Sequence, residues 1–87
     1  MMVMDLRILF VEKDVTTSDL LVPSLERKGY QVAVARTQGQ ALSCIRSHHP
    51  NLLVVDVASF GGNGHRISDT IRAQMEAAPT ILLLEKG

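Results

Sequence analysis

The chain has 87 residues, of which 46% are hydrophobic, and its nine Lys and Arg residues balance nine Asp and Glu residues. This length is that of one small domain, and the apolar fraction is sufficient for a core. The formal net charge is zero and the aromatic residues are Phe10, Tyr30 and Phe60. Because nucleic-acid surfaces need basic fields and stacking platforms, direct nucleic-acid binding by this segment is not expected.

The single cysteine, Cys44, excludes an internal disulfide and is typical of a reducing compartment. It shares the apolar side of a predicted helix with Ala41 and Ile45, so we interpret it as a buried structural residue. The N-terminal segment MMVMDLR is interrupted by Asp5 and Arg7 too soon for a signal peptide, and no apolar run is long enough to cross a membrane. We therefore expect a soluble cytoplasmic domain.

The first part of the chain is typical of strand, helix and strand. RILFV (residues 7–11) is a short apolar run bounded by charges, as in a buried strand, and QVAVA (residues 31–35) forms the second strand. A helix is predicted between them, from about Thr16 to Lys28, with Gly29 at the position where helices commonly stop. The predicted inner face of this helix consists of Leu20, Leu21, Leu25 and the aliphatic stem of Lys28. Pro23 lacks an amide proton, so we expect it to bend the helix or to move its start toward Ser18.

The second part continues the same alternation. Thr37 and Gln40 have the spacing of a capping box, which predicts a helix to about residue 47, and NLLVVDV (residues 51–57) contains the third strand. A glycine-rich loop (residues 61–64) precedes a third helix that starts near Asn63 or Gly64. The inner face of this helix repeats every four residues, at Ile67, Ile71 and Met75, and its end is expected near Pro79. TILLLE (residues 80–85) is the fourth strand.

This order predicts an α/β fold in which a parallel sheet has helices on both faces, with four strands and three helices. In such sheets ligands bind at the carboxyl ends of the strands. Charged residues gather at these ends: Glu12, Lys13, Asp14, Asp56 and Glu85. Asp56 closes an apolar strand, where a carboxylate is costly to bury unless a cation, a hydrogen bond or water meets it. We therefore predict a functional site at this edge.

Four segments resemble, in order and spacing, the first four strands of a response-regulator receiver domain: RILFVEKD, ERKGYQVAVARTQGQAL, HHPNLLVVDVASFGGNG and PTILLLEKG. The resemblance implies a flavodoxin-like signalling domain, not an enzyme, that accepts a phosphoryl group on Asp56 from a histidine kinase or phosphotransfer protein. It also implies Mg²⁺, held by Glu12, Asp14, Asp56 and the backbone carbonyl of Ala58. One or two carboxylates, a carbonyl and several waters are the ligands that Mg²⁺ prefers.

Three positions depart from the family's pattern. Lys13 stands where the family has the acid that binds the metal directly, so its ammonium is a candidate substitute for the cation. Leu84 stands at the switch position, where the family has Thr or Ser, and leucine cannot donate a hydrogen bond to a phosphoryl oxygen. Phe60 replaces a loop proline. These changes leave open an alternative, a pseudo-receiver that keeps the fold and binds partner proteins without phosphorylation.

A different class, a small flavodoxin-like enzyme or nucleotide-binding protein, is disfavoured because the segment EKDVTT after the first strand contains no glycine for a phosphate-binding turn.

By the same resemblance, residues 1–87 form a receiver-like domain that lacks the family's last helix–strand–helix portion. Without a fifth strand, the predicted strand at residues 80–85 becomes an apolar edge with unpaired backbone groups. Such an edge can pair with another chain. We therefore expect either a fragment of a longer response regulator or a homodimer formed through this edge.

Overall fold

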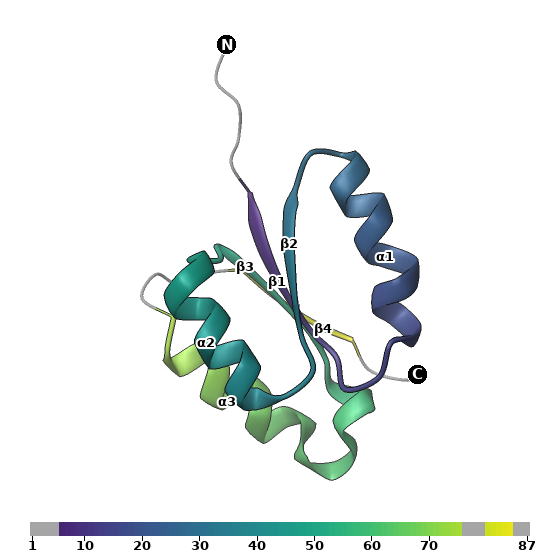
Figure 1. Cartoon of the computed structure of the whole chain (residues 1–87). Coiled ribbons are helices and arrows are strands. Elements are labelled where there is room, and N and C mark those ends of the chain that lie inside the picture. Colours follow the sequence, from purple (N-terminus) through teal and green to yellow (C-terminus); the bar gives the residue numbers. More distant parts are fainter. Residues whose placement is uncertain (1–5, 76–79, 85–87) are drawn as a thin grey trace.

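A computed structural model describes residues 6–75 and 80–84 (Figure 1). The elements, in chain order, are β1 (Arg7–Val11), α1 (Thr16–Arg27), β2 (Gln31–Ala35), α2 (Gln38–His48), β3 (Leu52–Asp56), the 3₁₀ helix η1 (Val57–Asn63), α3 (Gly64–Ala73) and β4 (Thr80–Leu84). The strands pair in parallel in the order β2-β1-β3-β4. The predicted fold class is confirmed.

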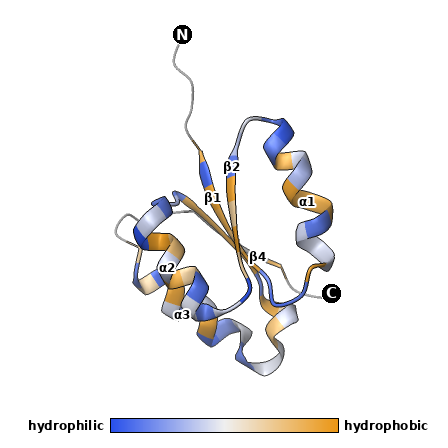
Figure 2. Cartoon of the chain, in the orientation of Figure 1, coloured by the Kyte–Doolittle hydropathy of each residue, from blue (hydrophilic) through white to orange (hydrophobic). Residues whose placement is uncertain are grey.

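The helices lie on both faces of the sheet, with α1 on one side and α2 and α3 on the other (Figure 1). Successive residues of a strand point to opposite faces, so each central strand contributes to two cores. In β1, Leu9 and Val11 face the helix pair, whereas Ile8 and Phe10 face α1. Figure 2 shows mostly hydrophobic strands between helices in which hydrophobic and hydrophilic residues alternate. This double covering explains why β1 and β3 are almost continuously apolar in sequence.

The inner face of α1 differs from the prediction. Leu20 is 74% exposed and Leu21 is also exposed, whereas Val22 and Leu25 pack against the sheet and Ser18 is buried. Ser18, Val22 and Leu25 are spaced by four and three residues, so they share one side of the helix. The predicted set of Leu20, Leu21 and the Lys28 stem is therefore wrong, and of that set Leu25 alone packs inward.

The start of α1 at Thr16 confirms the predicted helix from about Thr16. Pro23 lies inside the helix, so of the two effects expected of it, the shift of the start toward Ser18 does not occur. Its end agrees with the prediction, because Gly29 follows the helix with a positive φ of 95°, a conformation that favours glycine.

The capping of α2 is confirmed. The hydroxyl of Thr37 accepts a hydrogen bond from the Gln40 amide at 3.1 Å, and the Gln40 side chain accepts one from the Arg36 amide at 2.7 Å. Cys44 packs against the core on this side of the sheet, as predicted. These contacts fix the segment that connects β2 to α2.

The glycine-rich segment is not an open loop as predicted, because residues 57–63 form η1, kinked at Gly61. The start of α3 at Gly64, with Asn63 preceding it, is confirmed. A Cβ on Gly64 would lie 2.2 Å from the carbonyl oxygen of Val57, so only glycine permits this approach. The helix ends at Ala73, sooner than predicted, although Met75 still packs against the core. The expected stop at Pro79 lies outside the described residues.

Strand β4 ends the sheet on one side and β2 on the other. In the part of the chain that the structure describes, no strand pairs with the outer side of β4, the edge on which the predicted homodimer depends. Dimerisation stays a prediction. Among the described helices, none combines the length and the apolar character needed to span a membrane.

Candidate functional site

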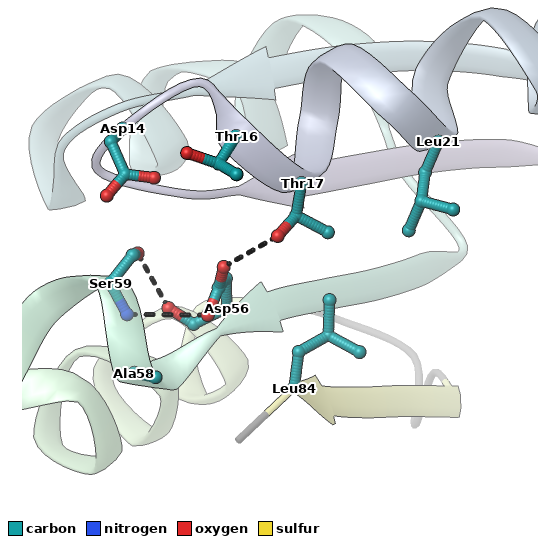
Figure 3. A pocket seen from close by; sticks show the side chains of 8 residues that line it. All are labelled: Asp14, Thr16, Thr17, Leu21, Asp56, Ala58, Ser59 and Leu84. Carbon is teal, nitrogen blue, oxygen red and sulfur yellow. Dashed lines mark hydrogen bonds between the residues drawn. The ribbon is translucent and has the colours of Figure 1, made fainter. Parts of the chain in front are cut away.

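A pocket with a volume of about 460 Å³ lies at the carboxyl edge of the sheet (Figure 3). It is lined by Asp14, Thr16, Thr17, Leu21, Asp56, Ala58, Ser59 and Leu84. Four residues selected from the sequence therefore meet in one place: Asp14, Asp56, Ala58 and Leu84. Glu85, the fifth charged residue predicted at this edge, lies outside the described residues.

Asp56 is the last residue of β3, and its half-buried carboxylate is held on both oxygens. The Thr17 hydroxyl donates to Oδ2 at 3.2 Å, and the Ser59 amide donates to Oδ1 at 3.3 Å (Figure 3). The Ser59 hydroxyl also donates to the Asp56 carbonyl at 2.8 Å. Two elements, α1 and η1, therefore orient this carboxylate.

Glu12 follows β1 and is completely buried. Its Oε2 accepts the Thr17 amide and its Oε1 accepts the Ser18 amide, both at 2.8 Å. The first amides of a helix have no partner within the helix, and Val15, the residue before α1, supplies none from its side chain. Glu12 therefore caps α1 with a full negative charge at the positive end of the helix dipole. It does not line the pocket.

The two carboxylates shift each other's titration. Burial alone would raise the pKa of Glu12, but the amide hydrogen bonds from Ser18 and Thr17 outweigh it and lower this pKa to about 2. The pKa of Asp56 is raised, first by burial and then by the adjacent Glu12, against the opposing hydrogen bonds from Thr17 and Ser59. Glu12 is thus the permanent anion of the pair, and its charge makes Asp56 the more basic carboxylate.

Arg36 follows β2 and joins the segment after β1 to α1. Its Nη1 donates to the Asp14 carbonyl at 2.6 Å and to the Ser18 hydroxyl at 3.0 Å, and it lies 3.6 Å from Oε1 of Glu12. Sequence analysis missed Arg36, Thr17 and Ser59. Arg36 could have been found from its place directly after β2, the strand beside β1. Nothing in the sequence pattern singled out Thr17 or Ser59.

Lys13 is exposed and does not line the pocket. Its backbone amide donates to the Ser59 hydroxyl at 2.9 Å, which ties the segment after β1 to η1. Within residues 6–75 and 80–84, no ion pair joins Lys13 to Asp56. The substitution of a metal by its ammonium stays a prediction.

The donors at this edge are of the type that suits Mg²⁺. Over the described ranges, no cluster of three or more His, Cys, Asp or Glu side chains is arranged as a protein cage for a metal ion. The pocket instead offers the carboxylates of Asp14 and Asp56 beside Ala58, with Glu12 next to Asp56. Mg²⁺ keeps several waters and needs only one or two carboxylates. A cation would also relieve the repulsion between Glu12 and Asp56.

Known proteins resemble the chain in sequence. The family model of the response regulator receiver domain matches residues 8–87. The DNA-binding response regulator MtrA of Mycobacterium tuberculosis is 31% identical over 80 residues, which are 92% of this chain and 35% of MtrA. The transcriptional regulatory protein AfsQ1 of Streptomyces coelicolor is 34% identical over 80 residues, with the same two coverages of 92% and 35%. The chain thus spans about a third of the length of the curated relatives it matches.

Solved structures resemble the fold. The non-phosphorylated HemR receiver domain from Leptospira biflexa has a TM-score of 0.75 and 31% identity, covering 93% of this chain and 64% of HemR's. The response regulator TrrA from Thermotoga maritima, solved in complex with Mg²⁺-BeF, has a TM-score of 0.74 and 28% identity, covering 92% of this chain and 69% of TrrA's.

Proposed function

Because this chain belongs to the response regulator receiver domain family of two-component systems, we propose that it accepts a phosphoryl group on Asp56. The observation that carries this proposal is the position of Asp56 at the tip of β3, in a pocket where two elements hold its carboxylate oxygens. A nucleophile with a fixed orientation loses little entropy on reaching the transition state.

The reaction transfers a phosphoryl group from the donor to the carboxylate of Asp56. A carboxylate oxygen of Asp56 forms a bond to phosphorus, while the bond from phosphorus to the donor breaks and its electron pair leaves with the donor atom. Burial and the neighbouring Glu12 raise the pKa of Asp56, so its carboxylate is more basic than that of an isolated aspartate. Before this step, Thr17 and Ser59 orient the carboxylate.

We propose Mg²⁺ as the cofactor, held by Asp56 and the carbonyl of Ala58 with Glu12 and Asp14 as the further acids. When bound, this ion supplies positive charge to the phosphoryl oxygens. The presence of Mg²⁺-BeF in the TrrA structure supports this choice. Both oxygens of Glu12 already accept amide hydrogen bonds and the residue does not line the pocket, so Glu12 would contribute negative charge beside the ion and not a direct bond to it.

We propose a histidine kinase as the phosphoryl donor. The support is the structure of TrrA in complex with the histidine kinase ThkA, in which TrrA is 28% identical to this chain with a TM-score of 0.73. The name of MtrA describes a DNA-binding regulator, and we propose that this chain corresponds to the receiver portion of such a regulator.

Incubation with acetyl phosphate and Mg²⁺, followed by intact-mass spectrometry, tests the proposed acceptor. We expect one phosphoryl adduct, which Asp56→Asn abolishes and Asp69→Asn, an exposed control on α3, retains. Absence of an adduct from the wild-type protein at every Mg²⁺ concentration would contradict the proposal and leave the pseudo-receiver alternative.

A further inference from the structure

The hydroxyl of Thr17 is directed at the reactive carboxylate. It lies in the pocket, partly buried, and donates to Oδ2 of Asp56 at 3.2 Å (Figure 3). The two leucine side chains of the pocket, Leu21 and Leu84, cannot donate a hydrogen bond. Any hydroxyl contact to a group bound on Asp56 must therefore come from a threonine or serine of the pocket.

The other hydroxyls of the pocket are less suited to this contact. The Ser59 hydroxyl has one proton, which it donates to the Asp56 carbonyl at 2.8 Å while it accepts the Lys13 amide. Thr16 is exposed and makes no hydrogen bond to Asp56 within the described residues. Thr17 is thus the hydroxyl whose proton already points at the acceptor.

The position of Thr17 is fixed by its own backbone. Its amide donates to Oε2 of Glu12 at 2.8 Å, and the next amide, that of Ser18, donates to Oε1 of the same buried carboxylate. A β-branched side chain in the first turn of a helix also has few rotamers. A donor held in this way needs little reorganisation when charge develops nearby, which is the condition for effective transition-state stabilisation.

We propose that Thr17 is a further catalytic residue of this domain, whose hydroxyl donates a hydrogen bond to a phosphoryl oxygen during and after transfer to Asp56, a role that rests on the proposed function of Asp56. As the carboxylate oxygen bonds to phosphorus and the donor atom leaves with its electron pair, negative charge moves from the carboxylate to the phosphoryl oxygens. These oxygens become the stronger acceptors for the Thr17 proton, which stays on the hydroxyl throughout.

The test compares four variants in the acetyl phosphate reaction with Mg²⁺. Thr17→Val removes the hydroxyl at nearly constant volume, Thr17→Ser and Thr17→Ala differ only in the hydroxyl, and Thr70→Val makes the same change on α3, away from the pocket. The rate of adduct formation is measured by intact mass at low and saturating acetyl phosphate, together with the lifetime of the adduct after desalting. Binding of beryllofluoride, followed by ¹⁹F NMR, gives a readout without phosphoryl transfer.

We expect Thr17→Val and Thr17→Ala to lower the saturated rate and the beryllofluoride affinity by about tenfold, as for the loss of one hydrogen bond to a charged group. Thr17→Ser and Thr70→Val should remain within about twofold of the wild type. Far-UV circular dichroism verifies folding, and if Thr17→Val unfolds, the Ser and Ala pair decides. Wild-type values for Thr17→Ala, or equal losses in Ser and Ala, would overturn the role of the hydroxyl. A wild-type protein without an adduct would overturn the function of Asp56 as well.

Discussion

Replacing Glu12 with glutamine keeps the size of the side chain and removes its charge. The pKa of Glu12 is about 2, against a usual value of 4.5, and each pKa unit corresponds to about 1.4 kcal/mol, so ionised Glu12 contributes about 3 kcal/mol to the free energy of unfolding. The two amide hydrogen bonds at 2.8 Å lead to the same order of magnitude, because a hydrogen bond to a charged group is worth roughly 1.5–3 kcal/mol. Glutamine retains one acceptor oxygen and places an NH₂ group against the other amide.

The pH dependence follows from the lowered pKa. The unfolded chain binds a proton at Glu12 more tightly than the folded chain, so the contribution of Glu12 is complete above about pH 5 and is lost as the pH falls toward 2. The penalty of Glu12→Gln should therefore be at most about 3 kcal/mol at pH 7, because losing the Glu12 charge also relieves its repulsion of Asp56, and roughly 1 kcal/mol at pH 3.

Urea denaturation followed by circular dichroism measures this penalty, since the chain has no tryptophan for fluorescence. Glu26→Gln, on the exposed side of α1, is the matched control and should change the free energy of unfolding by less than about 0.5 kcal/mol. If the Glu12→Gln penalty is as small as that of Glu26→Gln, Glu12 does not stabilise the fold as a cap of α1. If the penalty is equal at pH 7 and pH 3, the charge of Glu12 does not contribute to it.

Three further changes test the surroundings of the site. Asp56→Asn removes the repulsion from Glu12 and should raise Tm by a few degrees in calorimetry; a lower Tm would contradict the raised pKa. Gly64→Ala places a Cβ 2.2 Å from a backbone oxygen and should lower the free energy of unfolding by about 2 kcal/mol in urea, whereas Gly62→Ala, with open space around it, should not. Arg36→Gln should accelerate amide hydrogen exchange about tenfold in the segment after β1, whereas the exposed control Arg46→Gln should not; equal exchange in both would show that Arg36 does not hold this segment.

The order of strands and helices could be predicted because buried parallel strands are continuously apolar and the helices between them are amphipathic. The rotation of α1 about its axis could not. Leu21 is four residues from Leu25 and Val22 is three, and both spacings are helical, so periodicity alone does not select the inner face. The selection comes from Glu12, which binds the amides of Thr17 and Ser18 and so sets the helix start.

The site was predictable as far as the ends of the strands determine it. Asp14, Asp56 and Leu84 meet because parallel strands end at one edge of a sheet. Thr17 was missed because its contact joins distant parts of the chain, 39 residues apart. Ser59 was missed although it lies three residues from Asp56, because a serine after a strand does not by itself show that its amide binds a carboxylate. Glu12 was predicted at the correct edge of the sheet, but its role as the cap of α1 was not. A carboxylate after β1 can either cap the helix or bind a metal, and the sequence alone does not distinguish these roles.

The most direct test of the central claim is the location of the phosphoryl group. Borohydride reduces an acyl phosphate and converts the modified aspartate to homoserine, which peptide mass spectrometry then locates after incubation with acetyl phosphate and Mg²⁺. We predict homoserine at position 56 alone. Homoserine at another position, such as that of Asp14, or unmodified peptides throughout, would contradict the assignment of Asp56 as the phosphoryl acceptor.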